Sequence, residues 1–244
     1  MLSIFKTKPL LKDLIPKNFV DIHSHLLPGI DDGSKSVEET ASLMTQMNGL
    51  GINHFITTPH IFTNVWDNTE AVITKKLGDT KLELKHKNCY DTFEAGAEYM
   101  LDSFFLKRLE TEKLLTLKNN YLLVEMSYLN PPIQLYEILF EIQLAGYKPI
   151  LAHPERYVFY HNNYKEFHKL KNSGCLFQLN LLATVGYYGK NIEMVAEKLL
   201  QDDLYDFVGS DIHHQKHLDA LHTKVKIKSL PRLEKAFHNN LFFL

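Results

Sequence analysis

The stretch FVDIHSHLLPGIDDG, residues 19–33, determines how the rest of the sequence is interpreted. The apolar run at residues 19–22 predicts a buried strand, which leads into two histidines, a Pro-Gly turn and two aspartates. Residues two apart in an extended chain point to the same side, so His23 and His25 can direct their imidazoles at one point. An ordinary polar loop after a strand accounts for an isolated His-x-His pair as well as a metal site does. The rest of the sequence is needed to choose between these two interpretations.

The composition is that of an ordinary globular protein without a charge signature. The 244 residues are 45% hydrophobic and 23% charged, and the formal net charge is −2. Such a chain has no global basic field that would attract nucleic acid or an anionic membrane. Its two cysteines, Cys89 and Cys175, are too few and too far apart for a disulfide framework, which is typical of the reducing cytoplasm.

The first 18 residues mix lysines with apolar residues and lack the uninterrupted apolar core of a signal peptide. No window approaches the 18 or so consecutive apolar residues of a membrane span. We therefore expect residues 1–18 to form an arm, docked or partly disordered, and residues 19–244 to form a single domain. We expect no insertion into a membrane.

Short apolar strands alternate with helical segments along the whole chain. We expect strands at residues 19–22, 52–58, 91–95, 121–125, 148–152, 175–180 and 206–209. Helical patterns cover residues 34–50, 70–86, 101–117, 131–146, 163–172 and 192–200, and the C-terminal remainder, with an interruption near Pro231. The helix at 131–146 is expected to open with Pro131 and Pro132, which the first turn tolerates. This alternation is typical of a parallel α/β fold.

Ionisable side chains recur at the C-terminal ends of the expected strands. They are His23, His25, Asp32, His60, Glu98, Glu125, His153, Asp211 and His213. In a (β/α) barrel these strand ends line one mouth, where active sites lie, and closure makes the first and last strands neighbours. An open doubly wound sheet need not bring His23 beside Asp211, so the pattern favours a barrel of seven β/α units.

Five imidazoles and four carboxylates exceed the needs of a single catalytic zinc, which takes three protein ligands and a water. This number suits two or three divalent ions bridged by carboxylates. Mixed nitrogen and oxygen donors without thiolate favour manganese, iron or zinc over magnesium or calcium.

Seven motifs in order resemble the PHP (polymerase and histidinol phosphatase) superfamily. They are HSH at 23–25, DDG at 31–33, TPH at 58–60, GAE at 96–98, VE at 124–125, AHPERY at 152–157 and SDIH at 210–213. Within the superfamily they are most similar to the bacterial protein-tyrosine phosphatases of capsular and exopolysaccharide loci. The resemblance extends from residue 19 to about residue 217, and seven ordered motifs are far more specific than one His-x-His pair.

The resemblance implies a distorted, TIM-like (β/α)7 barrel with a trinuclear metal centre, manganese being favoured. It implies that one ion is held by His23, His25, Glu125 and Asp211, a second by Glu98, Glu125 and His153, and a third by Asp32, His60 and His213. It also implies a phosphotyrosine protein as partner, such as the tyrosine-rich tail of a kinase. The oligomeric state stays open.

The predicted activity is hydrolysis of a phosphotyrosine ester by a metal-bridging hydroxide. We assign catalytic roles to Arg156, His60 and Asp211, with Arg156 making a bidentate contact to the phosphate. A structural ion pair is the alternative for Arg156. The family often has a second phosphate-binding arginine after the Asp-x-His motif, and here that role is vacant or filled by Lys216 or His217.

Other functions remain as alternatives. They are a phosphatase of a small molecule such as histidinol phosphate, a phosphoesterase of another substrate, and a non-enzymatic module of a polysaccharide-export complex. A cysteine-dependent phosphatase is disfavoured, because the position six residues after each cysteine, where an arginine is needed, holds Ala95 or Leu181. We expect Tyr187 and Tyr188 to help wall the mouth, and Asp31 to be structural.

Overall fold

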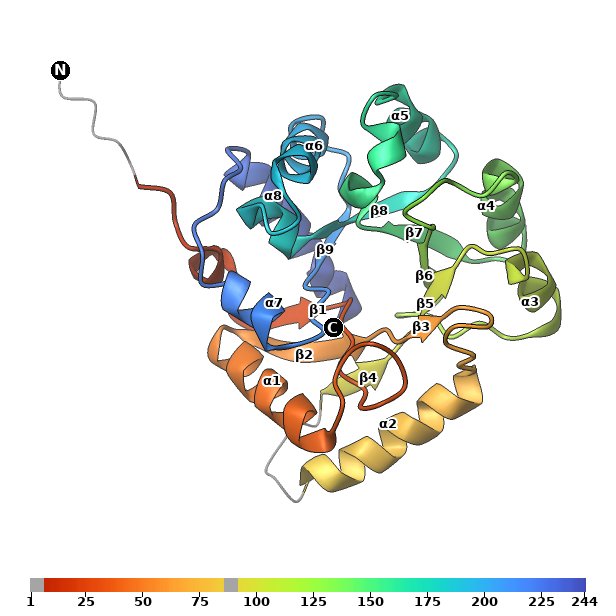
Figure 1. Cartoon of the computed structure of the whole chain (residues 1–244), viewed down its shortest axis with the longest axis horizontal. Coiled ribbons are helices and arrows are strands. Elements are labelled where there is room, and N and C mark those ends of the chain that lie inside the picture. Colours follow the sequence, from red (N-terminus) through yellow and green to blue (C-terminus); the bar gives the residue numbers. More distant parts are fainter. Residues whose placement is uncertain (1–6, 86–91) are drawn as a thin grey trace.

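The structure is a computed structural model and describes residues 7–85 and 92–244. Figure 1 shows strands around the centre of the molecule and helices outside them. One parallel sheet has the order β1 (Phe19–Asp21), β2 (Ile52–Thr57), β4 (Phe93–Ala95). The second parallel sheet has the order β3 (His60–Ile61), β5 (Glu98–Met100), β6 (Tyr121–Glu125), β7 (Lys148–Ala152), β8 (Leu176–Asn180), β9 (Phe207–Gly209). The protein is therefore a mixed α/β protein built on parallel sheets.

All seven expected strands are present among the described residues, and the expected number of seven was too low. The described residues contain two further short strands, β3 and β5. Pro59 has no N–H to donate to a ladder, so β2 ends before it and the chain resumes as β3. The two sheets stay joined, because Gly96 N–H donates to Thr57 O at 2.9 Å and Glu98 N–H donates to Pro59 O at 3.2 Å.

The segments that follow the first and last strands lie side by side, as predicted. Asp211 N–H donates to His23 O at 2.7 Å, and His25 N–H donates to Ile212 O at 2.9 Å. A single parallel bridge joins Ser24 to Ile212 at the same place. The segments that contain Ser24 and Ile212, almost 190 positions apart in sequence, are therefore hydrogen-bonded neighbours.

Each expected helical segment contains a helix. The helices are α1 (Val37–Gly49), α2 (Glu70–Lys85), α3 (Phe105–Thr111), α4 (Leu135–Leu144), α5 (Lys165–Asn172), α6 (Lys190–Gln201), α7 (Gln215–Ala220) and α8 (Leu230–Asn239). The predicted role of Pro131 and Pro132 was wrong, because both precede α4 instead of forming its first turn. The C-terminal remainder is helical with an interruption near Pro231, as predicted: residues 221–229 separate α7 from α8, and Pro231 lies in the first turn of α8. His86, Cys89 and Asp91, which the sequence predictions included, lie outside the described residues.

The strands bury apolar side chains on both faces. Alternate residues of β6 and β7, such as Leu122 and Leu151, belong to the large core that the helices cover. Their neighbours Leu123 and Ile150 face inward and join a smaller cluster, which also includes Val20 and Phe207. Two buried faces are what a parallel sheet with covering helices requires. The smaller cluster forms the base on which the polar strand ends are placed.

The described part of the N-terminal arm, residues 7–18, contacts the C-terminal region. Leu11 is fully buried. The N–H groups of Leu11 and Lys12 donate to Thr223 O and Leu221 O, both at 2.9 Å. Within residues 7–85 and 92–244, no helix combines the length and the apolar character that spanning a membrane requires.

Candidate metal centre

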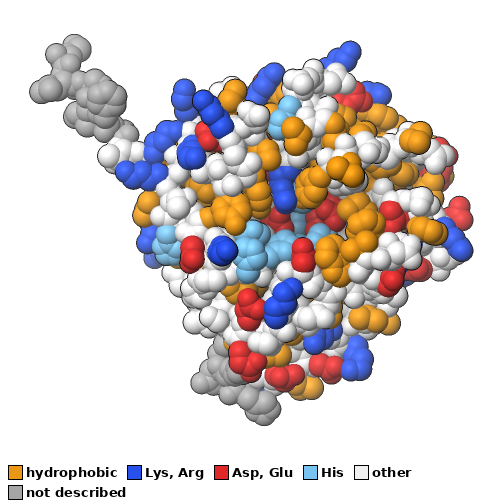
Figure 2. Space-filling view, viewed as in Figure 1, with side chains coloured by type: hydrophobic (Ala, Val, Ile, Leu, Met, Phe, Trp, Pro, Cys, Tyr) orange, Lys and Arg blue, Asp and Glu red, His pale blue; other side chains and the backbone are white. Residues whose placement is uncertain are grey.

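Most candidate ligands lie at or after the C-terminal end of a strand, above the smaller apolar cluster, but His60 and Glu98, which were predicted to follow strands, are the first residues of β3 and β5. Leu123 and Glu125 share the inward face of β6, because side chains alternate along a strand, and this face changes from apolar to acidic toward its C-terminal end. Figure 2 shows histidine and acidic side chains gathered in a hollow at the centre of this face, with hydrophobic side chains beside it. Parallel strands therefore deliver the ligands to one place, as the sequence predicts.

Six of these side chains form what we call the floor of the site. They are no more than 3% exposed: His23, His25, Glu98, Glu125, His153 and Asp211. Glu98 is central, since its Oε2 lies 3.2 Å from His23 Nε2 and 3.4 Å from His25 Nε2. Its Oε1 lies 3.2 Å from His153 Nε2. The Nε2 atoms of His23 and His25 are themselves only 3.3 Å apart.

Hydrogen bonds at Nδ1 orient the imidazoles of His23 and His25 so that their Nε2 atoms face Glu98. His23 Nδ1–H donates to Gln178 Oε1 at 2.8 Å, and His25 Nδ1–H donates to Asp31 Oδ2 at 2.8 Å. Such contacts fix the ring orientation and leave the opposite nitrogen free for a metal. The prediction of a supporting role for Asp31 agrees with this geometry. The contribution of Gln178 was not predicted, although a glutamine inside the apolar strand LFQLN is an available signal.

The two carboxylate oxygens of Asp211 have different partners: one faces the floor, and the other accepts hydrogen bonds from Arg156 and Asn180. Asp211 Oδ1 lies 3.4 Å from His23 Nε2, and Asp211 Oδ2 accepts hydrogen bonds of 2.8 Å from Arg156 Nη1 and from Asn180 Nδ2. The Arg156 guanidinium lies between two aromatic rings, 4.7 Å from the Tyr128 centroid and 4.3 Å from the Tyr188 centroid. Arg156 thus forms an ion pair with Asp211, which was the predicted alternative to a phosphate contact.

The remaining three candidate ligands are more accessible. Asp32 is 51% exposed at its side chain, and its Oδ1 lies 3.5 Å from His60 Nε2 and 3.4 Å from His213 Nε2. His60 connects this group with the floor, since its Nδ1 lies 2.9 Å from Glu125 Oε1. The nine residues therefore form one continuous cluster from a buried interior to an open surface.

The donor set fits divalent cations. Four groups of ligand atoms converge within 4.8 Å: His25–Asp32–His60–His213, His23–Glu98–His153, His23–His25–Asp211 and His60–Glu98–Glu125. Two buried atoms of the cluster, Glu98 Oε2 and His60 Nδ1, face each other at 3.2 Å and lack a hydrogen bond. Buried polar atoms normally have a partner, so such a pair is what a metal-binding cluster presents.

The carboxylates impose a strongly negative field on the histidines. Burial by itself would lower the pKa of His23, but the charges of Glu98 and Asp211 raise it to about 9. Burial likewise opposes ionisation of Glu98, yet the facing imidazoles hold the pKa of this carboxyl well below its usual range. A field that stabilises protonated imidazoles in a dry interior also attracts metal cations, which compete with those protons for the same nitrogens.

The backbone is strained at two candidate ligands. His153 has φ of 38° and Asp211 has φ of 52°, in the left-handed region. Among the described non-glycine residues, the other positive φ values belong to Asn18, Asn64, Asn119 and Asp203. Residues held in this region cost free energy and concentrate at functional sites. Glycine is also required at residue 209, where the backbone approaches His23 so closely that a Cβ would lie 2.6 Å from His23 Cβ.

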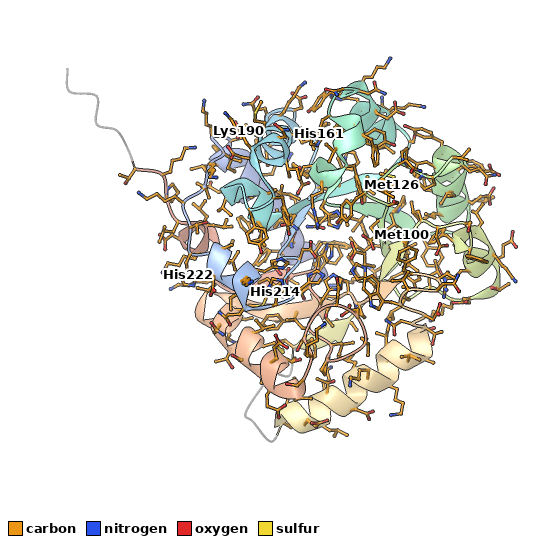
Figure 3. All side chains as sticks on the ribbon, viewed as in Figure 1. Met100, Met126, His161, Lys190, His214 and His222 are labelled. Carbon is orange, nitrogen blue, oxygen red and sulfur yellow. The ribbon has the colours of Figure 1, made fainter. Side chains whose placement is uncertain are left out.

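Two adjoining hollows open over the cluster. One, of about 280 Å³, is lined by all the candidate ligands except His23 and His25, together with Arg156, Phe62, Trp66, Met100 and Tyr128. The other, of about 330 Å³, is lined by Arg156, Tyr188, His214 and His217 beside Asp32, Asp211 and His213. Figure 3 shows Met100, which lines the first hollow, and His214, which lines the second, on different sides of the centre of the molecule.

Several other predicted positions can now be placed. Tyr188 lines the second hollow, as expected for a residue at the mouth, and Tyr187 is 42% exposed and packs its ring against Tyr188 and His217. Lys216 is not among the residues that line either hollow, whereas His217 is. Cys175 is a buried free thiol in the core, away from the cluster. The aromatic residues of the loop after β3 were not predicted to join the site.

Comparisons with known proteins agree with this geometry. The chain is 29% identical over 195 residues to the putative tyrosine-protein phosphatase CapC of Staphylococcus aureus, covering 80% of this chain and 76% of the relative. It is 30% identical over 204 residues to the tyrosine-protein phosphatase CpsB of Streptococcus pneumoniae, covering 80% and 83%.

A solved structure of the metal-dependent tyrosine phosphatases YwqE from Bacillus subtilis and CpsB from Streptococcus pneumoniae superimposes with a TM-score of 0.77. It has 26% sequence identity, and the match covers 88% of this chain and 86% of the other. Residues 19–234 match the family described as "Capsular polysaccharide synthesis, CpsB/CapC". The chain therefore belongs to the CpsB/CapC family of capsular polysaccharide synthesis.

Proposed function

We propose that this protein is a metal-dependent tyrosine-protein phosphatase of capsular or exopolysaccharide synthesis. The observation that carries the proposal is the convergence of nine histidine, aspartate and glutamate side chains at the strand ends of a CpsB/CapC family member. The tyrosine phosphatases among its relatives support the reaction class. We further propose a phosphotyrosine segment of a protein, such as a kinase tail, as the substrate.

We propose that residues 19–244 form one distorted (β/α)7 barrel, with residues 1–18 as its arm. The hydrogen bonds between the segments after β1 and β9 support closure, as do those that join β2–β3 to β4–β5. Closure would place all nine candidate ligands around one mouth. The cysteine usage of the chain favours the cytoplasm as its compartment.

We propose two to three divalent ions as cofactors, manganese before iron or zinc, held by these nine side chains. Asp32, His60 and His213 share one convergent group, and His23, His25 and Asp211 share another. Glu98 belongs to both remaining groups, with His153 in one and Glu125 in the other. This distribution favours Glu98 as a ligand shared between ions, in addition to the sharing by Glu125 that the family resemblance implies.

Bound divalent ions would lower the pKa of a coordinated water to about 7 and so supply a nucleophile at neutral pH. The chain itself positions the phosphate. Arg156 uses Nη1 for Asp211 and retains further N–H donors beside both hollows for phosphate oxygens. His217 lines the second hollow, and we propose it in place of the second arginine. A phenol with a pKa of about 10 is a fair leaving group and needs little protonation.

The test is metal analysis of the purified protein together with a substrate panel of phosphotyrosine peptide, histidinol phosphate and an oligonucleotide. We expect at least two metals per chain, turnover of the phosphotyrosine peptide and loss of turnover on chelation. Less than one metal per chain, or activity that survives chelation, would contradict the metal-dependent mechanism. A strong preference for histidinol phosphate would transfer the assignment to a small-molecule phosphatase.

A further inference from the structure

The loop at residues 61–69 projects aromatic side chains over the metal centre, and nothing in the proposed chemistry uses them. Phe62 and Trp66 of this loop, Met100 of β5 and Tyr128 after β6 line the hollow of about 280 Å³. We call these four residues the rim. Every other residue that lines this hollow is a candidate ligand or Arg156. The hollow therefore has a polar, charged base and an apolar wall.

The aromatic loop is held in place by hydrogen bonds. Phe62 and Trp66 pair through their backbones, with Phe62 N–H donating to Trp66 O at 3.0 Å and Trp66 N–H donating to Phe62 O at 2.8 Å. The buried Asn68 Nδ2 donates to His60 O and to Ile30 O, both at 2.9 Å. Asp102 Oδ2 accepts from Thr63 N–H at 3.2 Å. A loop tied at these points presents its side chains without a large ordering cost on binding.

The rim also contacts the candidate ligands directly. The Trp66 ring stacks on His60, with centroids 4.7 Å apart and planes at 14°. The Tyr128 ring stacks on His153 on another side of the hollow, with centroids 5.8 Å apart and planes at 29°. A group that is bonded to a phosphate on the candidate metal centre and extends into this hollow therefore lies beside these aromatic surfaces. An apolar cavity of about 150 Å³ holds a benzene molecule, so a hollow of about 280 Å³ has room for a phenyl group and its phosphate.

We propose that the rim binds the phenyl ring of the substrate and makes the site selective for aryl over alkyl phosphomonoesters, an inference that rests on the proposed phosphatase function. With divalent ions bound, the floor would attract the phosphate of any ester by charge, and it offers no contact that distinguishes one ester group from another. Phe62 and Trp66 supply aromatic surface against which a phenyl ring packs in offset or edge-to-face geometry. A serine phosphate carries only one methylene in that position and leaves the apolar wall exposed to water.

The chain offers a direct probe of this pocket, because Trp66 is its only tryptophan. Two non-hydrolysable ligands, phenylphosphonate and methylphosphonate, are titrated into the metal-loaded protein while Trp66 emission is recorded. We expect phenylphosphonate to bind about tenfold more tightly than methylphosphonate and to change the emission more strongly. In Phe62→Ala we expect this ratio to fall to about threefold or less, with methylphosphonate affinity and metal content unchanged.

Val65→Ala is the matched control, because Val65 lies in the same loop, is 52% exposed and does not line the hollow. It should keep the wild-type ratio. Met100→Ala, from a different element, is the second variant if Phe62→Ala alters the fold or the metal content, and it should also lower the ratio. An equal loss of affinity for both ligands, or an unchanged ratio in both rim variants, would overturn the inference.

Kinetics separate this inference from the proposed function. The wild-type protein and the two rim variants are assayed with one peptide that carries either phosphotyrosine or phosphoserine. We expect the rim variants to lower kcat/KM for the phosphotyrosine peptide about tenfold more than for the phosphoserine peptide. Wild-type protein that hydrolyses neither peptide contradicts the proposed function. Wild-type protein that prefers phosphotyrosine while both variants retain the full preference contradicts only the role of the rim.

Discussion

The floor and the rim of the site are held in place in different ways. Floor residues such as His23 and Glu125 lie at strand ends, where the register of parallel strands fixes their positions, and they are no more than 3% exposed. Rim residues such as Trp66 lie mostly in loops that local hydrogen bonds hold, and Tyr128 is 43% exposed. We therefore expect metal binding and substrate selectivity to depend on separate parts of the structure, which substitutions can address one at a time.

The largest effect is expected from the centre of the floor. Glu98→Gln removes the carboxylate whose Oε2 lies 3.2 Å from His23 Nε2 and also 3.2 Å from His60 Nδ1. We expect kcat/KM to fall by about 10³-fold, or about 4 kcal/mol, together with loss of bound metal. Steady-state kinetics and metal analysis measure both. Glu94→Gln is the matched control, since Glu94 is an exposed residue of β4. Full metal content and activity in Glu98→Gln would remove Glu98 from the floor.

A smaller effect is expected where floor and rim meet. Arg156→Lys replaces a planar guanidinium, packed between Tyr128 and Tyr188, by a point charge that cannot make paired phosphate contacts. We expect kcat/KM to fall by about 10²-fold, or about 2.7 kcal/mol. Metal content should persist, because Asn180 Nδ2 still donates to Asp211 Oδ2 at 2.8 Å.

Arg232→Lys, at an exposed ion pair with Asp203, is the control for the arginine-to-lysine change itself. Loss of metal in Arg156→Lys would show that this arginine mainly positions Asp211. In that case the ion pair between Arg156 Nη1 and Asp211 Oδ2, at 2.8 Å, would be the main function of Arg156, and its contact with phosphate would be secondary.

The floor could be predicted from the sequence because its residues follow short apolar strands, and parallel strands end at a common edge. The rim could not. The loop that carries Trp66 is positioned by hydrogen bonds from Asn68 and to Asp102, which are tertiary contacts that no periodic pattern encodes. The supporting roles of Gln178 and Asn180 also depend on tertiary packing, although their alternation in β8 places them on the inward face. The end of the strand before Pro59 was predicted, whereas strand β3 after it was missed, because two residues are too few to show a periodic pattern.

A partner just behind the floor should matter less than a floor residue. Asp31 accepts from His25 Nδ1–H at 2.8 Å and from Gly33 N–H at 2.9 Å, and it is buried, unlike the neighbouring Asp32. Asp31→Asn keeps the size and shape of the side chain but removes its charge, which weakens the hydrogen bond that orients the His25 ring. We therefore expect metal affinity to fall by about 10- to 100-fold. Competition with a chromogenic chelator measures this affinity. Asp79→Asn on the exposed face of α2 should leave it unchanged, and an unchanged affinity in Asp31→Asn would mean that the ring needs no such support.

The smallest effect is expected outside both regions, where only the scaffold is changed. Glu197 of α6 accepts hydrogen bonds from Lys228 N–H at 2.8 Å and Ser229 N–H at 3.2 Å, and so ties α6 to the start of α8. Burial alone would raise the pKa of Glu197, but these N–H donors outweigh it and lower the pKa. We expect Glu197→Gln to lower the free energy of unfolding at pH 7 by about 1 kcal/mol and to leave kcat/KM unchanged.

The pH dependence of this effect has a definite sign. A carboxyl whose pKa is lower in the folded than in the unfolded state contributes stability above its unfolded pKa and loses it as pH falls through the folded value. The difference between wild-type protein and Glu197→Gln should therefore be largest at neutral pH and shrink on acidification, as urea unfolding at a series of pH values would measure. Carboxylates of the floor titrate in both proteins and cancel in this difference. A difference that stays constant with pH would mean that Glu197 acts through the shape of its hydrogen bonds and not through its charge.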